Sequence, residues 1–289
     1  MGATTEIQPL IRFHGHKDQV TCLDKSSNKP LSSVAGHDLL LSGADDCTVR
    51  LWDARGGKVS QAIKGFRDTI SSVVIPEVHH CSFSFYVASG NEIREFDIRN
   101  SSSIIDAQRD VLSCLSVGEE DINQFKFRLQ GNALLSTNDD GNLYVSHVSG
   151  QAKGSRVIGK HSNISLAIAI NPVNQEVSSG GMDHHIKIWD AETSELIKDF
   201  DMNHPDFLSD SATTSGVNPR FVCSLDFNAT GTILTAGLGD GSIKLFNFAA
   251  TRPPKNKHHR PWKSMDLPEP HRHSHLQSVT IPLANWLIF

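Results

Sequence analysis

Apolar and polar residues alternate over short stretches along most of the 289-residue chain, which is the period-two pattern of β-strands with one buried face. Three stretches share the order of a polar turn, an alternating strand, an aromatic residue and an acid or amide. They are residues 43–53, 181–190 and 237–247. An aspartate stands six positions before each aromatic residue: Asp46 before Trp52, Asp183 before Trp189 and Asp240 before Phe246. The sequence therefore predicts an array of repeated β-units.

Two weaker copies fall between the first and second clear ones. Residues 91–97 lack the turn aspartate, and residues 138–147 keep Asp140 but end in Ser146 and His147. The closing positions 52, 96, 146, 189 and 246 are then 44, 50, 43 and 57 residues apart. A period of about 40–45 residues is typical of a four-stranded propeller blade, so two of the steps are expected to contain loop insertions.

The alternating stretches group into five predicted four-stranded blades within a single domain that covers residues 1–289. Their approximate limits are 14–63, 66–117, 121–158, 160–201 and 219–250. The outer strand of the second blade is expected at 111–117, and that of the fifth is not evident. Residues 203–219 form a predicted polar inserted loop, and residues 251–275 a linker rich in proline, histidine and basic residues.

The complete endings Trp52-Asp53 and Trp189-Asp190, the opening Gly15-His16 and its partial echo at His161 carry a family resemblance. The chain resembles the WD-repeat β-propeller family over nearly its whole length. This resemblance implies an all-β fold and a role in protein interaction, although such propellers serve many purposes. The acidic residues 119–123, residues 161–164 and the insertion before Phe221 also resemble the order of features in one WD-repeat subfamily.

The resemblance also implies one structural hydrogen-bonded set in each of two blades. The two sets are His16, Ser42, Asp46 and Trp52, and His161, Ser179, Asp183 and Trp189. A hydrolytic triad uses the same residue types, but a single active site does not require the combination twice. We therefore expect a structural role and no enzyme. The second blade lacks the aspartate and the fifth has Ala236 in place of serine, so both are expected to be weaker.

Residues 275–281 resemble the first strand of a sixth blade, and residues 276–289 are predicted to form a partial sixth blade, within which the sequence ends. Rings of this family usually have seven blades, and an open ring would expose unpaired strand edges. A truncated seven-bladed ring is the expectation. The alternative is a five- or six-bladed ring completed by Ile7–Phe13 as an outer strand.

Composition and charge reduce the number of function classes that fit the chain. A net charge of −5 and a pI near 6.3 provide no basic field for nucleic acid. Five scattered cysteines without a Cys-x-x-Cys pair, no signal peptide and no long apolar run predict a protein of the cytoplasm or nucleus, without a membrane span. The glycines at 237–241 precede a strand, so they predict a hairpin turn and not a phosphate loop.

The C-terminal histidines lie in a proline-rich stretch without nearby cysteine, which favours a solvated linker over a metal site. They are His258, His259, His271, His273 and His275. Neither a metal nor a cofactor is expected. Basic residues between 252 and 263 form at most a weak nuclear import signal, because they are not consecutive.

An arginine follows the repeat ending in two adjacent blades, as Trp52-Asp53-Ala54-Arg55 and Phe96-Asp97-Ile98-Arg99. This pattern resembles the Trp-Asp-x-Arg box of substrate receptors that dock on the adaptor of cullin-4 RING ubiquitin ligases, with Phe96 departing from tryptophan. The resemblance implies that Arg55, Arg99, Asp53, Asp97 and Trp52 bind the adaptor. The opposite face would take an unknown substrate protein through the loop 203–219. The alternative is a ligase-independent scaffold or peptide reader in which these arginines are ordinary surface residues. In either case we expect the chain to be monomeric apart from its partners.

Overall fold

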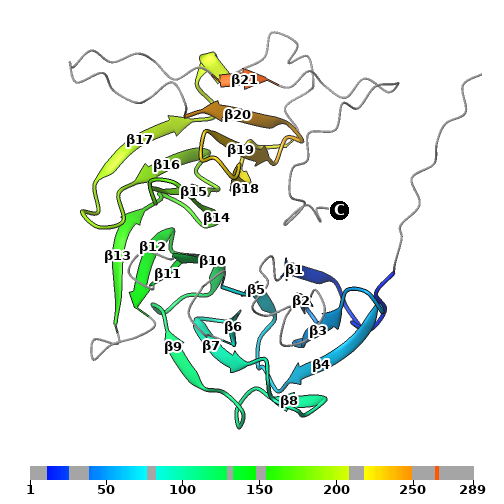
Figure 1. Ribbon diagram of the computed structural model, residues 1–289. Coiled ribbons are helices and arrows are strands. Elements are labelled where there is room, and N and C mark those ends of the chain that lie inside the picture. The colour runs from blue at the N-terminus through cyan, green and yellow to red at the C-terminus, as the bar shows by residue number, and fades with distance from the viewer. Residues whose placement is uncertain are drawn as a thin grey trace, which may run out of the picture. The chain divides into compact units, whose positions relative to one another are not determined.

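The computed structural model describes residues 12–25, 39–76, 83–128, 133–147, 154–207 and 218–248, together with the backbone of 264–266. The chain forms two compact units. Unit 1 contains Met1–Ser89 and Arg94–Cys114, and unit 2 contains Gly90–Ile93 and Leu115–Phe289. Within the described residues, every element is a strand except the short 3-10 helix η1 (Pro205–Phe207) (Figure 1).

Two sheets account for the strands of unit 1, and the second of them also includes residues 92, 93, 115 and 116 of unit 2. The first runs in the order β1 (Val20–Lys25), β2 (Leu39–Ala44), β3 (Val49–Asp53), β4 (Lys58–Lys64), β8 (Ile104–Asp106). The second runs in the order β5 (Ile70–Val74), β6 (Ser84–Ser89), β7 (Glu92–Asp97), β9 (Ser113–Ser116). A buried cluster that includes Leu41, Ile63, Phe85 and Phe96 forms the core of unit 1. Burying one such side chain contributes about 1.5–3 kcal/mol.

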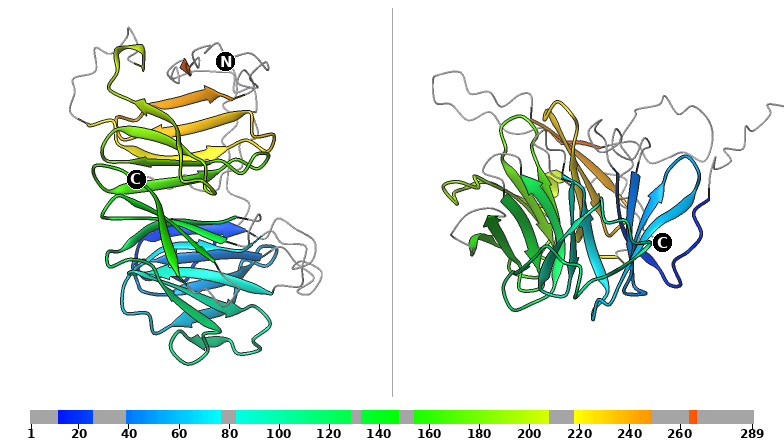
Figure 2. Two further views of the ribbon diagram at one scale, coloured as in Figure 1. Left: turned by 90° about the vertical axis from the view of Figure 1, so that its left-hand side faces the viewer. Right: turned by 60° about the horizontal axis from the view of Figure 1, so that its bottom comes forward.

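Unit 2 contains three four-stranded sheets whose strands follow one another in chain order. The third sheet is β10 (Ile122–Arg128), β11 (Ala133–Asn138), β12 (Asn142–His147), β13 (Ser155–Lys160). The fourth is β14 (Ser165–Ile170), β15 (Val177–Gly181), β16 (His185–Trp189), β17 (Leu196–Asp201). The fifth is β18 (Val222–Phe227), β19 (Ile233–Leu238), β20 (Ile243–Asn247), β21 (Ser264–Asp266). Figure 2 shows these strands side by side from two further directions.

The predicted alternation appears as alternating burial in the third strand of a repeat. In β16, for example, Ile186 and Ile188 are fully buried while His185 and Lys187 are partly exposed. Because side chains of a strand point to opposite faces in turn, this pattern fixes the register of each hairpin. The β15–β16 pair accordingly places Val177 opposite Trp189 and Ser179 opposite Lys187.

The connection after β7 differs from the sequence-based expectation. The outer strand of the second sheet is β9, shorter than the predicted 111–117. The residues before it contribute β8, which pairs in parallel with β4 and makes the first sheet five-stranded. A three-residue strand inside a polar stretch carries no periodic signal. β21 lies in the stretch 251–275 that was interpreted as a linker. The expected sixth blade, residues 276–289, lies outside the described residues, as do 208–217 of the loop.

Candidate interaction site

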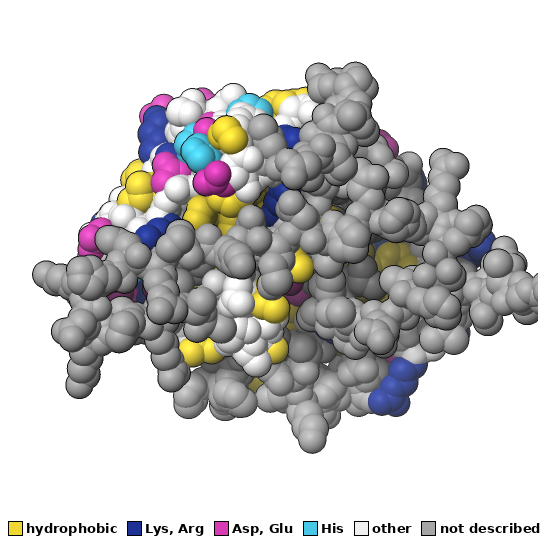
Figure 3. All heavy atoms as spheres, turned by 90° about the horizontal axis from the view of Figure 1, so that it is seen from above, with side chains coloured by type: hydrophobic (Ala, Val, Ile, Leu, Met, Phe, Trp, Pro, Cys, Tyr) yellow, Lys and Arg dark blue, Asp and Glu magenta, His cyan; other side chains and the backbone are white. Residues whose placement is uncertain are grey.

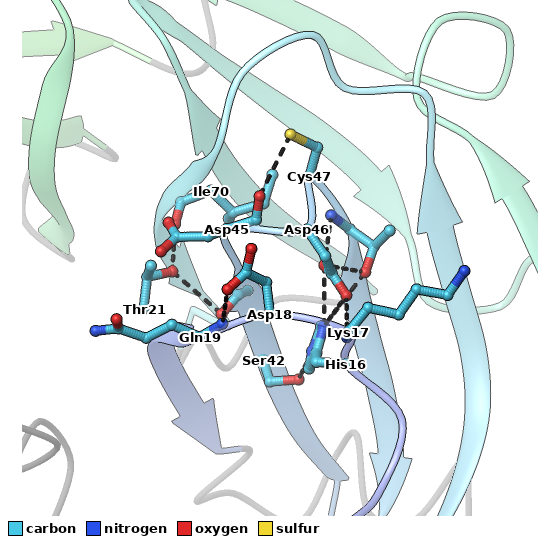
Figure 4. Close-up of polar contacts among 12 residues, drawn as sticks. His16, Lys17, Asp18, Gln19, Thr21, Ser42, Asp45, Asp46, Cys47 and Ile70 are labelled. Carbon is cyan, nitrogen blue, oxygen red and sulfur yellow. Dashed lines mark hydrogen bonds and ion pairs between the residues drawn. The ribbon is translucent and has the colours of Figure 1, made fainter.

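The first hydrogen-bonded set joins His16, which precedes β1, to Ser42 of β2, the turn residue Asp46 and Trp52 of β3. Figure 4 shows the His16, Ser42 and Asp46 side chains of this set. Trp52 Nε1–H donates to Ser42 Oγ over 2.8 Å, and Ser42 Oγ lies 2.7 Å from His16 Nε2. The other ring nitrogen, Nδ1, lies 3.1 Å from Asp46 Oδ2. Asp46 also accepts the side-chain hydroxyl of Thr48 at 2.6 Å. This order places the imidazole proton on Nδ1, facing the carboxylate.

The fourth sheet repeats the arrangement with a separate set of residues. His161 Nδ1 lies 2.9 Å from Asp183 Oδ1, and His161 Nε2 lies 2.7 Å from Ser179 Oγ. Trp189 Nε1–H donates to the same Ser179 oxygen at 2.8 Å. Ser179 is fully buried and His161 is 1% exposed. A serine oxygen that is buried and shared by indole and imidazole is not placed to attack a substrate, so the geometry is that of a structural network.

Protonation of these groups depends on burial and on the network together. Burial lowers the pKa of His16, and the hydrogen bond with Asp46 opposes this effect only in part. For Asp183, burial alone would raise the pKa. Hydrogen bonds and the charge of His161, together with backbone amides, outweigh burial and hold the Asp183 pKa well below its ordinary value. The carboxylate is therefore the stable form of Asp183 in the folded chain.

The fifth sheet keeps the predicted turn aspartate Asp240 but pairs it with Arg220 and Ser242, which sequence reasoning missed. Arg220 Nε–H donates to Asp240 Oδ2 at 2.8 Å, and Ser242 Oγ–H donates to Asp240 Oδ1 at 2.6 Å. Ala236 occupies the serine position, opposite Lys244, and Phe246 occupies the tryptophan position. Phenylalanine has no N–H to satisfy. Ala236 therefore leaves no indole donor unpaired, and the expectation that it weakens this sheet has no support from hydrogen bonding.

Three turns that follow the third strand of a sheet share one backbone geometry. In each, an aspartate Oδ1 accepts the amide N–H two residues further on: Asp53 from Arg55 (2.9 Å), Asp97 from Arg99 (2.8 Å) and Asp190 from Glu192 (2.8 Å). This aspartate turn is a common local structure. The third turn carries an acid where the first two carry arginine. Glu192 receives a 2.6 Å hydrogen bond from the buried Arg128.

The two arginine turns lie at the same end of neighbouring segments in unit 1. Arg55 precedes β4 and Arg99 precedes β8, and these two strands run parallel with Ala62 paired to Ile104. Gln61 Nε2–H also donates to the carbonyl oxygen of Asn100. Each arginine therefore lies in the turn before its strand, and β8 begins opposite Ala62, the fifth residue of β4. We call Arg55, Arg99, Asp53 and Asp97 the arginine surface.

The two guanidinium groups have different surroundings. Arg99 donates to Asp97 through Nε–H (3.0 Å to Oδ1) and Nη2–H (2.6 Å to Oδ2), and its Cζ lies 4.3 Å from the centre of the Phe83 ring. The hydrogen bonds from Arg99 lower the pKa of Asp97, with burial acting in the opposite direction. In the described part of the chain, the Arg55 guanidinium has no hydrogen bond or ion pair. Trp52, predicted with this site, is 2% exposed, so it can act only through the position of Asp53.

Histidine and acidic side chains lie next to each other on the face seen in Figure 3. The ion pairs of unit 2 include His185–Asp199 at 2.7 Å and His204–Asp206 at 3.5 Å. These are pairs, and no group of three His, Cys, Asp or Glu side chains able to hold a metal occurs among the described residues. In the same residues, no helix has the length and apolar character needed to cross a membrane. The C-terminal histidines lie outside them.

Comparisons with known proteins agree with the repeat pattern. The family model described as WD domain, G-beta repeat (WD40) matches residues 7–53, 153–190 and 212–247. The chain is 27% identical over 249 residues to a WD repeat-containing protein 53 homolog of Dictyostelium discoideum, covering 79% of the chain and 62% of that relative. That name is also the subfamily which the order of sequence features resembles. Eukaryotic translation initiation factor 3 subunit I of Drosophila grimshawi is 26% identical, covering 67% of the chain and 57% of that protein. The chain thus spans about three fifths of these relatives' length.

Solved structures extend the agreement to the fold. The WD40 β-propeller domain of Doa1 matches with a TM-score of 0.62 at 17% identity, covering 83% of the chain and 67% of that domain. The computationally designed protein Ika8 matches with a TM-score of 0.58 at 22% identity, covering 82% and 61%. The predicted all-β fold is confirmed by these matches and by the antiparallel sheets of the chain itself. The chain is therefore similar to WD40-repeat proteins in sequence, and it has an all-β fold that matches WD40 β-propeller structures.

Proposed function

We propose that the chain is a protein-interaction scaffold whose arginine surface docks on the adaptor of a cullin-4 RING ubiquitin ligase. The observation that carries this proposal is the repetition of one aspartate-to-arginine turn at the same end of β4 and β8. WD40 propellers usually bind proteins and do not catalyse reactions, which fits a docking role. Arginine suits such a role, because its planar guanidinium offers several donors in a fixed geometry.

The chemistry of the arginine surface supports docking over a purely local function. The Arg99 side chain is 55% exposed despite its contacts with Asp97 and Phe83, so part of its donor set faces solvent. Arg55 is exposed and its charge is uncompensated by any ion pair within the described residues. Arginine is enriched at the energetic centres of protein interfaces. Substrate would bind elsewhere, and the loop 203–219 is our candidate.

A ligase-independent scaffold is the second candidate function. Two observations favour it: the third turn has Glu192 in place of arginine, and the relatives bear names as different as Protein NEDD1 of Homo sapiens and THO complex subunit 3 of Arabidopsis thaliana. Under this function the arginine surface would be incidental. The two candidates differ in whether the chain binds the adaptor at all.

The deciding experiment measures the affinity of the full chain for the purified adaptor by biolayer interferometry. The Arg55→Ala/Arg99→Ala double variant should bind at least tenfold more weakly, a loss of about 1.4 kcal/mol, since arginine is enriched among the interface residues that cost about 2 kcal/mol or more when truncated. Arg109→Ala is the matched control, because the Arg109 side chain is 74% exposed, lies on the connection that also carries Arg99, and forms an ion pair with its neighbour Asp110. Circular dichroism verifies that each variant is folded. A folded wild-type chain that does not bind would leave the scaffold function.

A further inference from the structure

The Arg99 guanidinium is fixed on two sides by its own chain. Asp97 occupies the edge formed by Nε–H and one Nη2–H, and the ring of Phe83 lies 4.3 Å from Cζ. A guanidinium carries five N–H donors. Three of them therefore remain, two on Nη1 and one on Nη2, at the outer end of the group. Asp97 thus contacts one edge of the guanidinium and Phe83 one face, so the N–H groups at its outer end can donate to a partner.

The backbone around Arg99 is held as well. The amide of Ile98 donates to the carbonyl of Phe83 at 2.8 Å, which keeps the ring and the arginine together. Gln61 Nε2–H donates to the carbonyl of Asn100. The amide of Ala62 donates to the carbonyl of Ser103 at 2.9 Å, where β8 begins to pair with β4. Ordering a loop on binding costs free energy. Because these hydrogen bonds already order the turn in the free chain, binding a partner would require little further ordering here.

The guanidinium of Arg99 is paired directly with the Asp97 carboxylate, whereas the guanidinium of Arg55 has no ion pair within the described residues, although Asp53 lies two residues before it. A surface that attracts its partner by positive charge alone would bind more tightly after removal of the Asp97 carboxylate. A surface that binds through a fixed orientation of its donors would bind more weakly after the same change, because the guanidinium would be free to rotate. The two mechanisms therefore give opposite signs for one substitution.

We propose that Arg99 is a pre-positioned donor for a carbonyl oxygen of the partner, with Asp97 and Phe83 as positioning residues, while Arg55 supplies the free positive charge. This division of roles rests on the proposed function. The partner atom is an acceptor without full charge, because the Asp97 carboxylate stands beside the site. Arg99 thus sets the geometry of docking, and Arg55 sets its dependence on salt.

The test compares adaptor affinity for the full chain and two conservative variants at low and high salt. Asp97→Asn keeps an oxygen for the Arg99 amide but loses the bidentate contact, and we expect binding about three- to tenfold weaker. Phe83→Leu keeps an apolar side chain but removes the ring, and should weaken binding about two- to fivefold. Asp190→Asn changes the same charge in the turn without arginine and should leave affinity unchanged. Arg55→Ala should make the affinity for the adaptor less dependent on salt. Arg99→Ala should lower the affinity but leave its salt dependence almost unchanged.

Binding by Asp97→Asn that equals or exceeds that of the wild type would overturn the inference. Relaxation of the arginine Nε–Hε groups in the free chain provides an independent readout. We expect Arg99 to be rigid and Arg55 mobile, with Phe83→Leu increasing the motion of Arg99. Equal mobility of the two wild-type arginines would overturn the inference even if the adaptor binds. A rigid Arg99 in a chain that ignores the adaptor would refute the proposed function and the docking role but not the fixed geometry.

Discussion

Ser179→Ala tests whether the buried network stabilises the fold through hydrogen bonds. The substitution removes one oxygen that is fully buried and that contacts both Trp189 Nε1 (2.8 Å) and His161 Nε2 (2.7 Å). A buried group left unpaired costs about 1–3 kcal/mol. Since the two groups share one oxygen and their costs are not strictly additive, we expect the free energy of unfolding to fall by about 2–4 kcal/mol.

Ser178→Ala is the matched control on the same strand. Ser178 is also fully buried, but its hydroxyl has no hydrogen-bond partner among the described residues. Removal of an unpaired buried hydroxyl is expected to change stability by less than about 0.5 kcal/mol, or to stabilise the chain. The two variants therefore share burial and chemistry and differ only in the bonds that are lost.

Urea denaturation followed by both circular dichroism and tryptophan fluorescence measures the two changes. Coincident transitions by the two probes are required before a free energy is extracted, because a chain of two compact units can unfold in steps. Equal losses for Ser178→Ala and Ser179→Ala would refute the reasoning, since the cost would then come from packing and not from hydrogen bonds.

Two further predictions concern residues of unit 2. The pKa of Asp183 is lower in the folded chain than its ordinary value of 3.8, so its contribution to stability is present above that value and is lost as pH falls through the folded pKa; acid titration of Asp183→Asn should show a weaker loss of stability below about pH 4. Gly141 has φ +78°, and a Cβ there would lie 2.4 Å from the carbonyl oxygen of Asn163, so Gly141→Ala should lower the melting temperature, whereas Gly154→Ala, which meets no atom within 4 Å, should not. A melting temperature equal to wild type for Gly141→Ala would contradict the observed backbone geometry.

The elements found from sequence are those with a local signal. The aspartate of each turn and the alternating strand that follows lie within about ten residues, so Asp46, Asp183 and Asp240 can be recognised without knowledge of the tertiary structure. The hydrophobic period then groups the strands into sheets. These features sufficed to predict the all-β class.

The features that were missed depend on contacts between distant residues. The contact of Phe83 with Arg99 arises because two strand ends meet, and no spacing in the sequence marks it. Arg220 takes the place of histidine beside Asp240 through a side chain long enough to start from a different position. β8 is too short to have a period, and its pairing with β4 joins residues far apart in the sequence. Such contacts require the folded chain.

The most direct test of docking by the arginine surface is a titration of the ¹⁵N-arginine-labelled chain with the cullin-4 adaptor, observed at the Nε–Hε groups. Residue-specific variants assign the signals of Arg55, Arg99 and the exposed Arg109. Docking predicts that the Arg55 and Arg99 signals shift or broaden in proportion to complex formation while that of Arg109 stays unchanged. Complex formation that leaves both Arg55 and Arg99 unperturbed would contradict the proposed site.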